Sequence, residues 1–123
     1  MKPKIVLAED DPNIARLTMF KLEKEGYEVI WEKDGGAALE SIIKLKPDLV
    51  LLDVMMPVMD GYQVLTKIKE NQTINDIPVI MLTAKGQGSD VVNGFEKGAD
   101  EYIVKPFRPS DLIACIKKIL NKK

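Results

Sequence analysis

Hydrophobic residues lie along the chain in short runs that are separated by longer stretches of helical periodicity. Residues 4–8, 49–52 and 77–82 are apolar at nearly every position, and residues 27–32 and 102–104 form two further candidate strands. Runs that are apolar on successive residues are typical of strands covered on both faces, which are usually parallel members of an α/β sheet. The pattern therefore predicts five strands, most of them buried.

The stretches between these runs carry apolar residues at the spacing of one helix face. Asp11 and Ser89 are capping residues that precede the first and fourth of these stretches, while Gly26, Pro47 and Gly98 mark helix ends. The predicted helices contain Ile14, Leu17 and Phe20; Leu39, Ile42 and Ile43; residues 62–71; Val91, Val92 and Phe95; and Leu112, Ile113, Ile116, Ile119 and Leu120.

Strand and helix alternate five times with short connections, which defines the fold class. Because crossovers between parallel strands are almost always right-handed, such a chain closes as a single doubly wound, flavodoxin-like (βα)5 domain. We expect a five-stranded parallel sheet of order 2-1-3-4-5, with the carboxyl ends of the first and third strands side by side at the switch point. All 123 residues are assigned to this one domain, residues 1–123.

Charge and composition limit the binding partners and the cellular location that we expect. Eighteen basic and 19 acidic residues leave a net charge of −1, so the domain has no global electrostatic reason to bind nucleic acid or an anionic membrane. The longest apolar runs, residues 48–57 and 77–84, are too short to span a bilayer. With no signal-peptide pattern after Met1 and one cysteine, Cys115, we expect a cytoplasmic protein.

Acidic residues occupy the two strand ends that meet at the switch point. Glu9, Asp10 and Asp11 follow the first strand, and Asp53 ends the third. Carboxylates a few ångströms apart repel one another unless a cation lies among them, and oxygen ligands of this kind favour Mg²⁺. Two other interpretations stay open at this point: Asp53 is a loop cap, or Asp11 caps a helix while Glu9 and Asp10 face solvent.

The remaining strand ends add groups of a different kind. The fourth strand ends in Thr83 and Ala84, which offer a hydroxyl and a backbone N–H, and the fifth ends in Lys105, which offers an ammonium. A hydroxyl, an amide and an ammonium beside a cation are the groups that bind a phosphoryl group. Asp53 is then the central nucleophile that would attack phosphorus.

Four motifs, KIVLAEDDPNI, PDLVLLDVMMPVMDG, IPVIMLTA and GADEYIVKPF, give the chain a close resemblance to the receiver domain of bacterial two-component response regulators. The resemblance covers essentially the whole chain and implies that Asp53 is the phosphorylated residue. It also implies that Asp10, Asp53 and the backbone carbonyl of Met55 hold Mg²⁺ directly, with Glu9 reaching it through water. Lys105 matches the family's lysine, and its bond to Pro106 is expected to be cis.

The resemblance further implies a signalling role rather than ordinary enzyme activity. The phosphoryl donor would be a sensor histidine kinase or a phosphotransfer protein, since this chain contains no histidine of its own. Thr83 and Tyr102 would act as the switch that changes the surface of the fourth helix, fifth strand and fifth helix toward a downstream effector. Tyr102 as a plain core residue is the alternative.

Part of the chain resembles receivers of winged-helix transcription factors, which dimerise through salt bridges on that same surface. Asn93 and Cys115 stand where two arginines are typical. We therefore expect a monomer or a weak dimer, with no direct nucleic-acid contact by this domain.

The pattern leaves three other functions to compare with a phosphorylated receiver. One is a receiver-shaped interaction module that is never phosphorylated. Another is a metal-dependent phosphohydrolase or Toprim-like domain, for which a second acid is expected just after Asp53, where Val54 and Met55 stand. An FMN-binding domain is disfavoured because its first loop should offer hydroxyls and amides rather than carboxylates. Trp31 is interpreted as structural.

Overall fold

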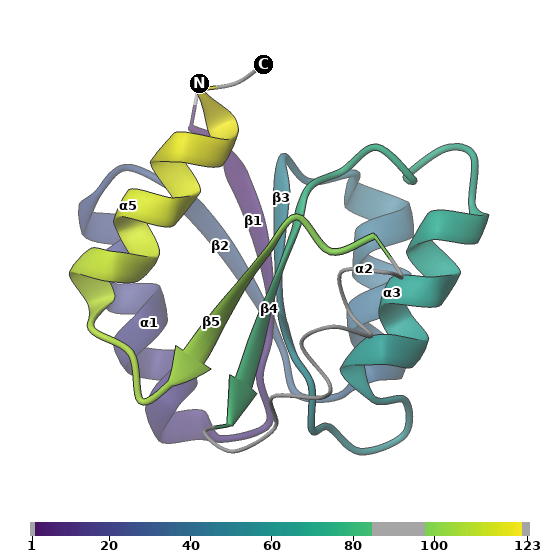
Figure 1. Ribbon diagram of the computed structural model, residues 1–123, viewed down its shortest axis with the longest axis horizontal. Helices are drawn as coiled ribbons and strands as arrows, with labels where there is room; N and C mark the ends of the chain where they lie inside the picture. The colour runs from purple at the N-terminus through teal and green to yellow at the C-terminus, as the bar shows by residue number, and fades with distance from the viewer. Residues whose placement is uncertain (1, 85–97, 122–123) are drawn as a thin grey trace.

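Five parallel strands form one sheet in the order β2-β1-β3-β4-β5 in the computed structural model, which describes residues 2–84 and 98–121 (Figure 1). The strands are β1 (Lys4–Ala8), β2 (Glu28–Glu32), β3 (Leu49–Asp53), β4 (Val79–Ala84) and β5 (Glu101–Lys105). The strand order and the doubly wound fold predicted from the sequence are confirmed.

Helices cover both faces of the sheet. They are α1 (Pro12–Lys24), α2 (Gly35–Leu45), α3 (Gly61–Glu70) and α5 (Pro109–Leu120). In Figure 1, α1 and α5 lie on one side of the sheet and α2 and α3 on the other. The helix predicted around Val91 and Phe95 falls within residues 85–97, outside the described residues.

Alternate residues of each central strand supply the two halves of the core. Val50 and Leu52 of β3 pack with residues of α2 and α3, whereas Leu49 and Leu51 pack with residues of α1 and α5. All four are fully buried, because β3 has a strand on each side and helices on each face. This burial explains why the run is apolar at every position.

Element bounds differ from the sequence prediction where turns compete with strands. β4 begins at Val79 rather than at residue 77, because the Ile77 N–H donates to the Ile74 carbonyl in a turn and Pro78 has no N–H to donate. β2 begins one residue later than predicted because the Tyr27 N–H donates to the Leu22 carbonyl at the end of α1. Within residues 2–84 and 98–121, no helix is long and apolar enough to cross a membrane.

Candidate functional site

The carboxyl ends of the strands meet at one edge of the sheet, at the arrowheads of Figure 1. We call the group formed there by Glu9, Asp10, Asp53, Thr83 and Lys105 the carboxyl rim. Its members are neighbours because the register pairs Ala8 with Leu52, Asp53 with Leu82, and Thr83 with Val104. Residues up to 96 positions apart in sequence thereby reach the same edge of the fold.

Lys105 joins the two buried carboxylates of the carboxyl rim. Its Nζ donates to Glu9 Oε1 at 2.8 Å and to Asp53 Oδ2 at 3.0 Å. Glu9 is fully buried and Asp53 is 5% exposed. A buried carboxylate is costly unless it is paired and hydrogen-bonded, so the Lys105 ammonium is what makes this pair of acids tolerable.

Burial dominates the ionisation of Glu9. It raises the pKa of the Glu9 carboxyl from 4.5 to about 7, with the hydrogen bond from Lys105 opposing the rise and the neighbouring Asp53 adding to it. For Lys105, burial favours the neutral amine. The hydrogen bonds and charges of Glu9 and Asp53 outweigh this effect and raise the pKa of the ammonium. The raised pKa keeps Lys105 an ammonium at neutral pH, whereas the pKa of Glu9 lets its carboxyl accept a proton near neutral pH.

Three acids of the carboxyl rim are close enough to share one cation. Glu9, Asp10 and Asp53 each offer an oxygen, and these oxygens lie within 4.8 Å of one another. Asp10 is exposed while the other two are buried, so the cluster opens to solvent on one side. An all-oxygen, partly solvated donor set fits Mg²⁺, which retains several waters when bound to protein.

Asp11 serves the helix rather than the carboxyl rim. Its Oδ1 accepts from the backbone N–H groups of Asn13 at 2.9 Å and Ile14 at 3.4 Å, which makes it the N-cap of α1. Glu9 and Asp10 do not both face solvent, since Glu9 is buried in the carboxyl rim.

The loop after β3 is held close to Asp53. Asp53 Oδ1 accepts from the Met55 N–H at 3.3 Å, and the Gly61 N–H donates to the Val54 carbonyl at 2.9 Å. A Cβ on Gly61 would lie 2.4 Å from the Asp53 carbonyl oxygen, so only glycine fits where α3 begins. The Met55 side chain is 61% exposed, and its backbone carries the contact to Asp53.

Thr83 and Tyr102 occupy different depths. Thr83 is 1% exposed near the end of β4, and Ala84 ends that strand beside Lys105. Tyr102 is half-buried, packs against the core on the α2 and α3 side, and shares a 3.4 Å hydroxyl contact with Tyr62 of α3. The pairing with Tyr62 was not predicted, because strand order does not show which side chains of a helix and a strand meet.

Trp31 makes another contact near the carboxyl rim that the sequence did not reveal. Its indole Nε1–H donates to the Glu9 backbone carbonyl at 2.8 Å, across from β2 to the end of β1. A tryptophan in a strand predicts burial, but not where the indole N–H will point.

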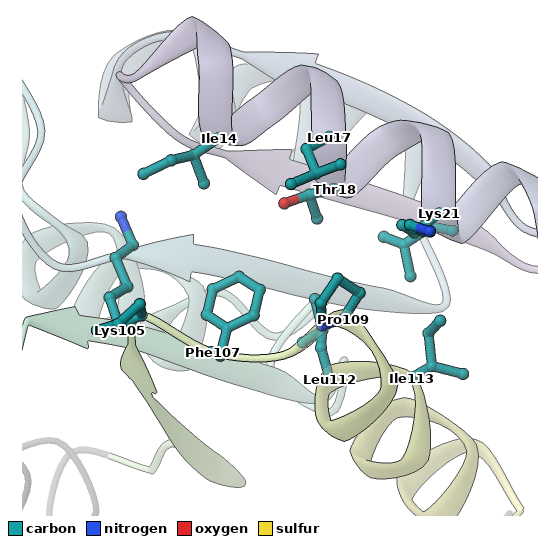
Figure 2. Close-up of a pocket in the computed structure, with 11 residues that line it drawn as sticks. Ile14, Leu17, Thr18, Lys21, Lys105, Phe107, Pro109, Leu112 and Ile113 are labelled. Atoms are coloured by element: carbon teal, nitrogen blue, oxygen red, sulfur yellow. The ribbon is translucent and has the colours of Figure 1, made fainter.

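An apolar pocket of about 260 Å³ lies between α1 and α5 beside the carboxyl rim. Figure 2 shows Phe107 between the two helices, with Lys105 at one end of the pocket. The lining is apolar apart from Thr18, Lys21 and Lys105. Lys105 belongs to both sites, but the acids that could hold a cation lie on the carboxyl rim and do not line this pocket.

The fold and the carboxyl rim together define a doubly wound α/β domain with an acid and lysine site at the switch point of its sheet. The response regulator receiver domain family matches residues 5–117. The chain belongs to this family, whose members are signalling domains rather than ordinary enzymes. The Lys105–Pro106 bond is cis, as the resemblance implied.

Individual relatives agree with the family assignment. The chain is 39% identical over 120 residues to the DNA-binding dual master transcriptional regulator RpaA of Synechocystis, covering 98% of this chain and 50% of the regulator. It is 41% identical over 122 residues to the alkaline phosphatase synthesis transcriptional regulatory protein PhoP of Bacillus subtilis, covering 99% and 50%. The chain thus spans about half the length of these curated relatives.

A solved structure matches the whole fold. A CheY-like response regulator receiver domain protein from Methanospirillum hungatei superposes with a TM-score of 0.92 at 33% identity, covering 99% of this chain and 96% of that one.

Proposed function

We propose that this receiver domain accepts a phosphoryl group on Asp53 in a reaction that requires Mg²⁺. The observation that supports this most directly is the arrangement around Lys105, whose ammonium lies 2.8 Å from Glu9 and 3.0 Å from Asp53 beside an open cluster of acids. A buried carboxylate with a cation on one side and an acidic, solvent-facing cation site on the other is arranged to receive an anionic group.

Asp10, Asp53 and the backbone carbonyl of Met55 would hold the Mg²⁺, with Glu9 contacting it through water. When bound, the cation neutralises charge on the phosphoryl oxygens. Asp10 provides the solvent-facing part of this cluster. Asp11 is excluded from the set because its carboxylate is engaged at the start of α1.

Asp53 is the nucleophile of the transfer. One of its oxygens attacks phosphorus, and the bond between phosphorus and the donor's histidine nitrogen breaks. The electron pair of that bond leaves with the imidazole, and a new Asp53 oxygen–phosphorus bond forms. Lys105, the Thr83 hydroxyl and the Ala84 N–H then donate hydrogen bonds to the phosphoryl oxygens, so Lys105 exchanges its bond with Asp53 for one with the phosphoryl group.

The signal partners follow from this chemistry. A sensor histidine kinase or a phosphotransfer protein supplies the phosphoryl group, and movement of Thr83 and Tyr102 changes the face that includes β5 and α5. Two of the relatives are named as transcriptional regulators and are about twice as long as this chain, which supports an effector domain as the downstream partner. We propose that nucleic-acid contact belongs to that partner, and that the receiver is a cytoplasmic monomer or weak dimer.

Mass spectrometry after incubation with acetyl phosphate and Mg²⁺ tests the proposal. The wild-type protein should gain one phosphoryl group, Asp53→Asn should gain none, and Asp11→Asn should behave as wild type because Asp11 only caps α1. Phosphorylation of Asp53→Asn would refute Asp53 as the acceptor. No mass gain in the wild type, with or without Mg²⁺, would favour an interaction module that is never phosphorylated.

A further inference from the structure

Both backbone polar groups of Glu9 are bound to β2. The Glu9 N–H donates to the Glu32 carbonyl at 3.1 Å, and the Glu9 carbonyl accepts from the Trp31 indole at 2.8 Å. The first bond continues the ladder of the parallel pair, which ends at the register Ala8 with Glu32. The second bond comes from a side chain, so the Glu9 carbonyl keeps this donor only while residue 31 is a tryptophan.

That carbonyl belongs to the peptide that carries Asp10. Asp10 lies outside helix and strand, and its side chain is exposed, so its own packing does little to orient it. The chain on the far side is held without Trp31, because the Asp11 N–H donates to Glu9 Oε2 at 3.2 Å and the Asp11 carboxylate caps α1. The backbone at Asp10 is thus held on both sides, and on the Glu9 side by the Trp31 indole.

The surroundings of Trp31 are rigid enough for this role. Its ring is half-buried against the core on the α1 and α5 side, and the Lys33 ammonium lies 5.7 Å from the ring centroid. A large ring with few accessible rotamers presents its N–H in a fixed direction. An apolar side chain in its place would leave the Glu9 carbonyl without this donor.

We propose that Trp31 is a positioning residue of the cation and phosphoryl site. Its indole N–H fixes the peptide between Glu9 and Asp10, so that the Asp10 carboxylate faces Glu9 and Asp53 before Mg²⁺ arrives. The inference rests on the proposed function, since it assigns Trp31 to the same Mg²⁺ site. Groups that orient metal ligands typically change metal affinity about 10–100-fold when they are removed, and we expect about tenfold here because the bond acts through the backbone.

The wild-type protein offers a direct readout. Trp31 is the single tryptophan of the sequence, so the indole N–H gives one isolated NMR resonance. Titration with Mg²⁺ should shift this resonance with the same dissociation constant as the backbone amide of Asp10. An indole resonance that stays fixed while the Asp10 amide moves would contradict the proposal.

Variants then isolate the hydrogen bond. Replacing Trp31 with benzothienylalanine removes the N–H and keeps the shape of the ring, while Trp31→Phe removes the N–H with a smaller ring. Both should bind Mg²⁺ about tenfold more weakly, followed through the Asp10 amide. The benzothienyl variant should remain folded in chelator, with its melting temperature lowered only as far as the loss of one hydrogen bond requires. Tyr27→Phe is the matched control, because Tyr27 belongs to the same half of the core and precedes β2 at its other end.

The outcomes separate this inference from the proposed function. Wild-type Mg²⁺ affinity in the benzothienyl variant, alongside normal binding and phosphorylation of the wild type, overturns the role of Trp31 alone. Failure of the wild type to bind Mg²⁺ or to accept a phosphoryl group overturns the proposed function, and the role of Trp31 with it.

Discussion

Acidic side chains stand at both ends of the parallel sheet, and the two ends use them differently. At the amino end, Asp48 precedes β3 and Asp100 precedes β5. Asp48 accepts from the Lys4 N–H at 2.7 Å and donates its own N–H to the Lys4 carbonyl at 2.8 Å. Asp100 makes the same reciprocal pair with Val79, at 2.8 and 2.9 Å. We call these two pairs the amino rim.

The two buried acids of the carboxyl rim accept instead from amides two residues further along their own loops, Glu9 from the Asp11 N–H at 3.2 Å and Asp53 from the Met55 N–H at 3.3 Å. Glu9 and Asp53 share the single ammonium of Lys105, and Asp10 faces solvent. An acid that is bound by a backbone amide of the neighbouring strand is committed to the fold, because releasing it would leave a strand N–H unpaired. Acids that share one side-chain cation are not committed in this way, and under the proposed function they exchange it for a metal ion and a phosphoryl group. The partner of an acid, more than the acid itself, distinguishes a structural strand end from a reactive one.

The largest effect is expected from removing the shared cation. Lys105→Met should slow phosphorylation by acetyl phosphate about 100-fold or more, because loss of one preorganised donor to a charged transition state typically costs that much. The rate of phosphoryl incorporation, measured by mass spectrometry, checks it.

Lys117→Met is the control for Lys105→Met. Lys117 also pairs with a carboxylate, Glu25, at 3.0 Å, but that pair is exposed on the surface. Its removal should leave the rate unchanged. Equal slowing by the two variants would refute a specific role for Lys105.

The stability of the metal-free protein should depend on pH through Glu9 of the carboxyl rim. The folded-state pKa of Glu9, about 7, lies above its ordinary value of 4.5, so between these values the folded state retains a proton that the unfolded state releases. The free energy of unfolding should therefore fall through this group as pH rises from about 5 to 7.

Glu9→Gln removes this dependence. Relative to wild type, the variant should gain stability as pH rises across that window, by up to about 3 kcal/mol if the whole shift is expressed. Urea unfolding in chelator at several pH values measures it. Parallel pH profiles for the two proteins would show that Glu9 does not hold its proton in the fold.

The amino rim should respond in stability alone. Asp100→Ala leaves the N–H of fully buried Val79 without its partner and should cost about 1–3 kcal/mol in the free energy of unfolding. Asp48→Ala should cost less, because water can reach the half-exposed Lys4. Urea unfolding ranks the two variants.

Both amino-rim variants should keep wild-type phosphorylation rates, since their carboxylates lie at the opposite end of the strands from Asp53. Loss of phosphorylation in a variant that remains folded would break the comparison between the rims.

The sequence predicted the fold and the membership of the carboxyl rim for the same reason. Apolar runs such as residues 49–52 admit one interpretation as buried parallel strands, and the order of the strands then determines which ends meet. Asp53 and Lys105 were brought together by topology alone, without knowledge of any side-chain direction.

What the sequence did not predict depends on where side chains point. Glu9 was expected to reach a cation through water, and its direct bond to Lys105 could not be inferred from strand order. Trp31 was interpreted as structural because its burial is readable and the direction of its N–H is not. The start of β4 was predicted two residues too early. Ile77 is buried as a strand residue would be, but its N–H is used in a turn.

The smallest expected effect concerns backbone strain at the two ends. Lys46, near the amino rim, and Val58, in the loop after β3, both have positive φ angles, 48° and 71°. Lys46 has ordinary left-handed geometry as the C-cap of α2, and its N–H donates to the Ile42 carbonyl at 2.9 Å. Val58 is β-branched and 83% exposed, so it adopts this conformation without the packing that would offset the strain.

Glycine at each position compares the strain directly. Val58→Gly should raise the free energy of unfolding by about 1 kcal/mol, since left-handed geometry costs about 1–2 kcal/mol for a residue with a Cβ and glycine loses part of that gain to unfolded-chain entropy. Lys46→Gly should change it by only a few tenths of a kcal/mol, because an unbranched residue tolerates the helix C-cap. Urea unfolding of both variants measures the difference. If Val58→Gly is no more stable than wild type, the loop beside Asp53 stores no strain. The two ends of the sheet then differ only in how their acids are paired.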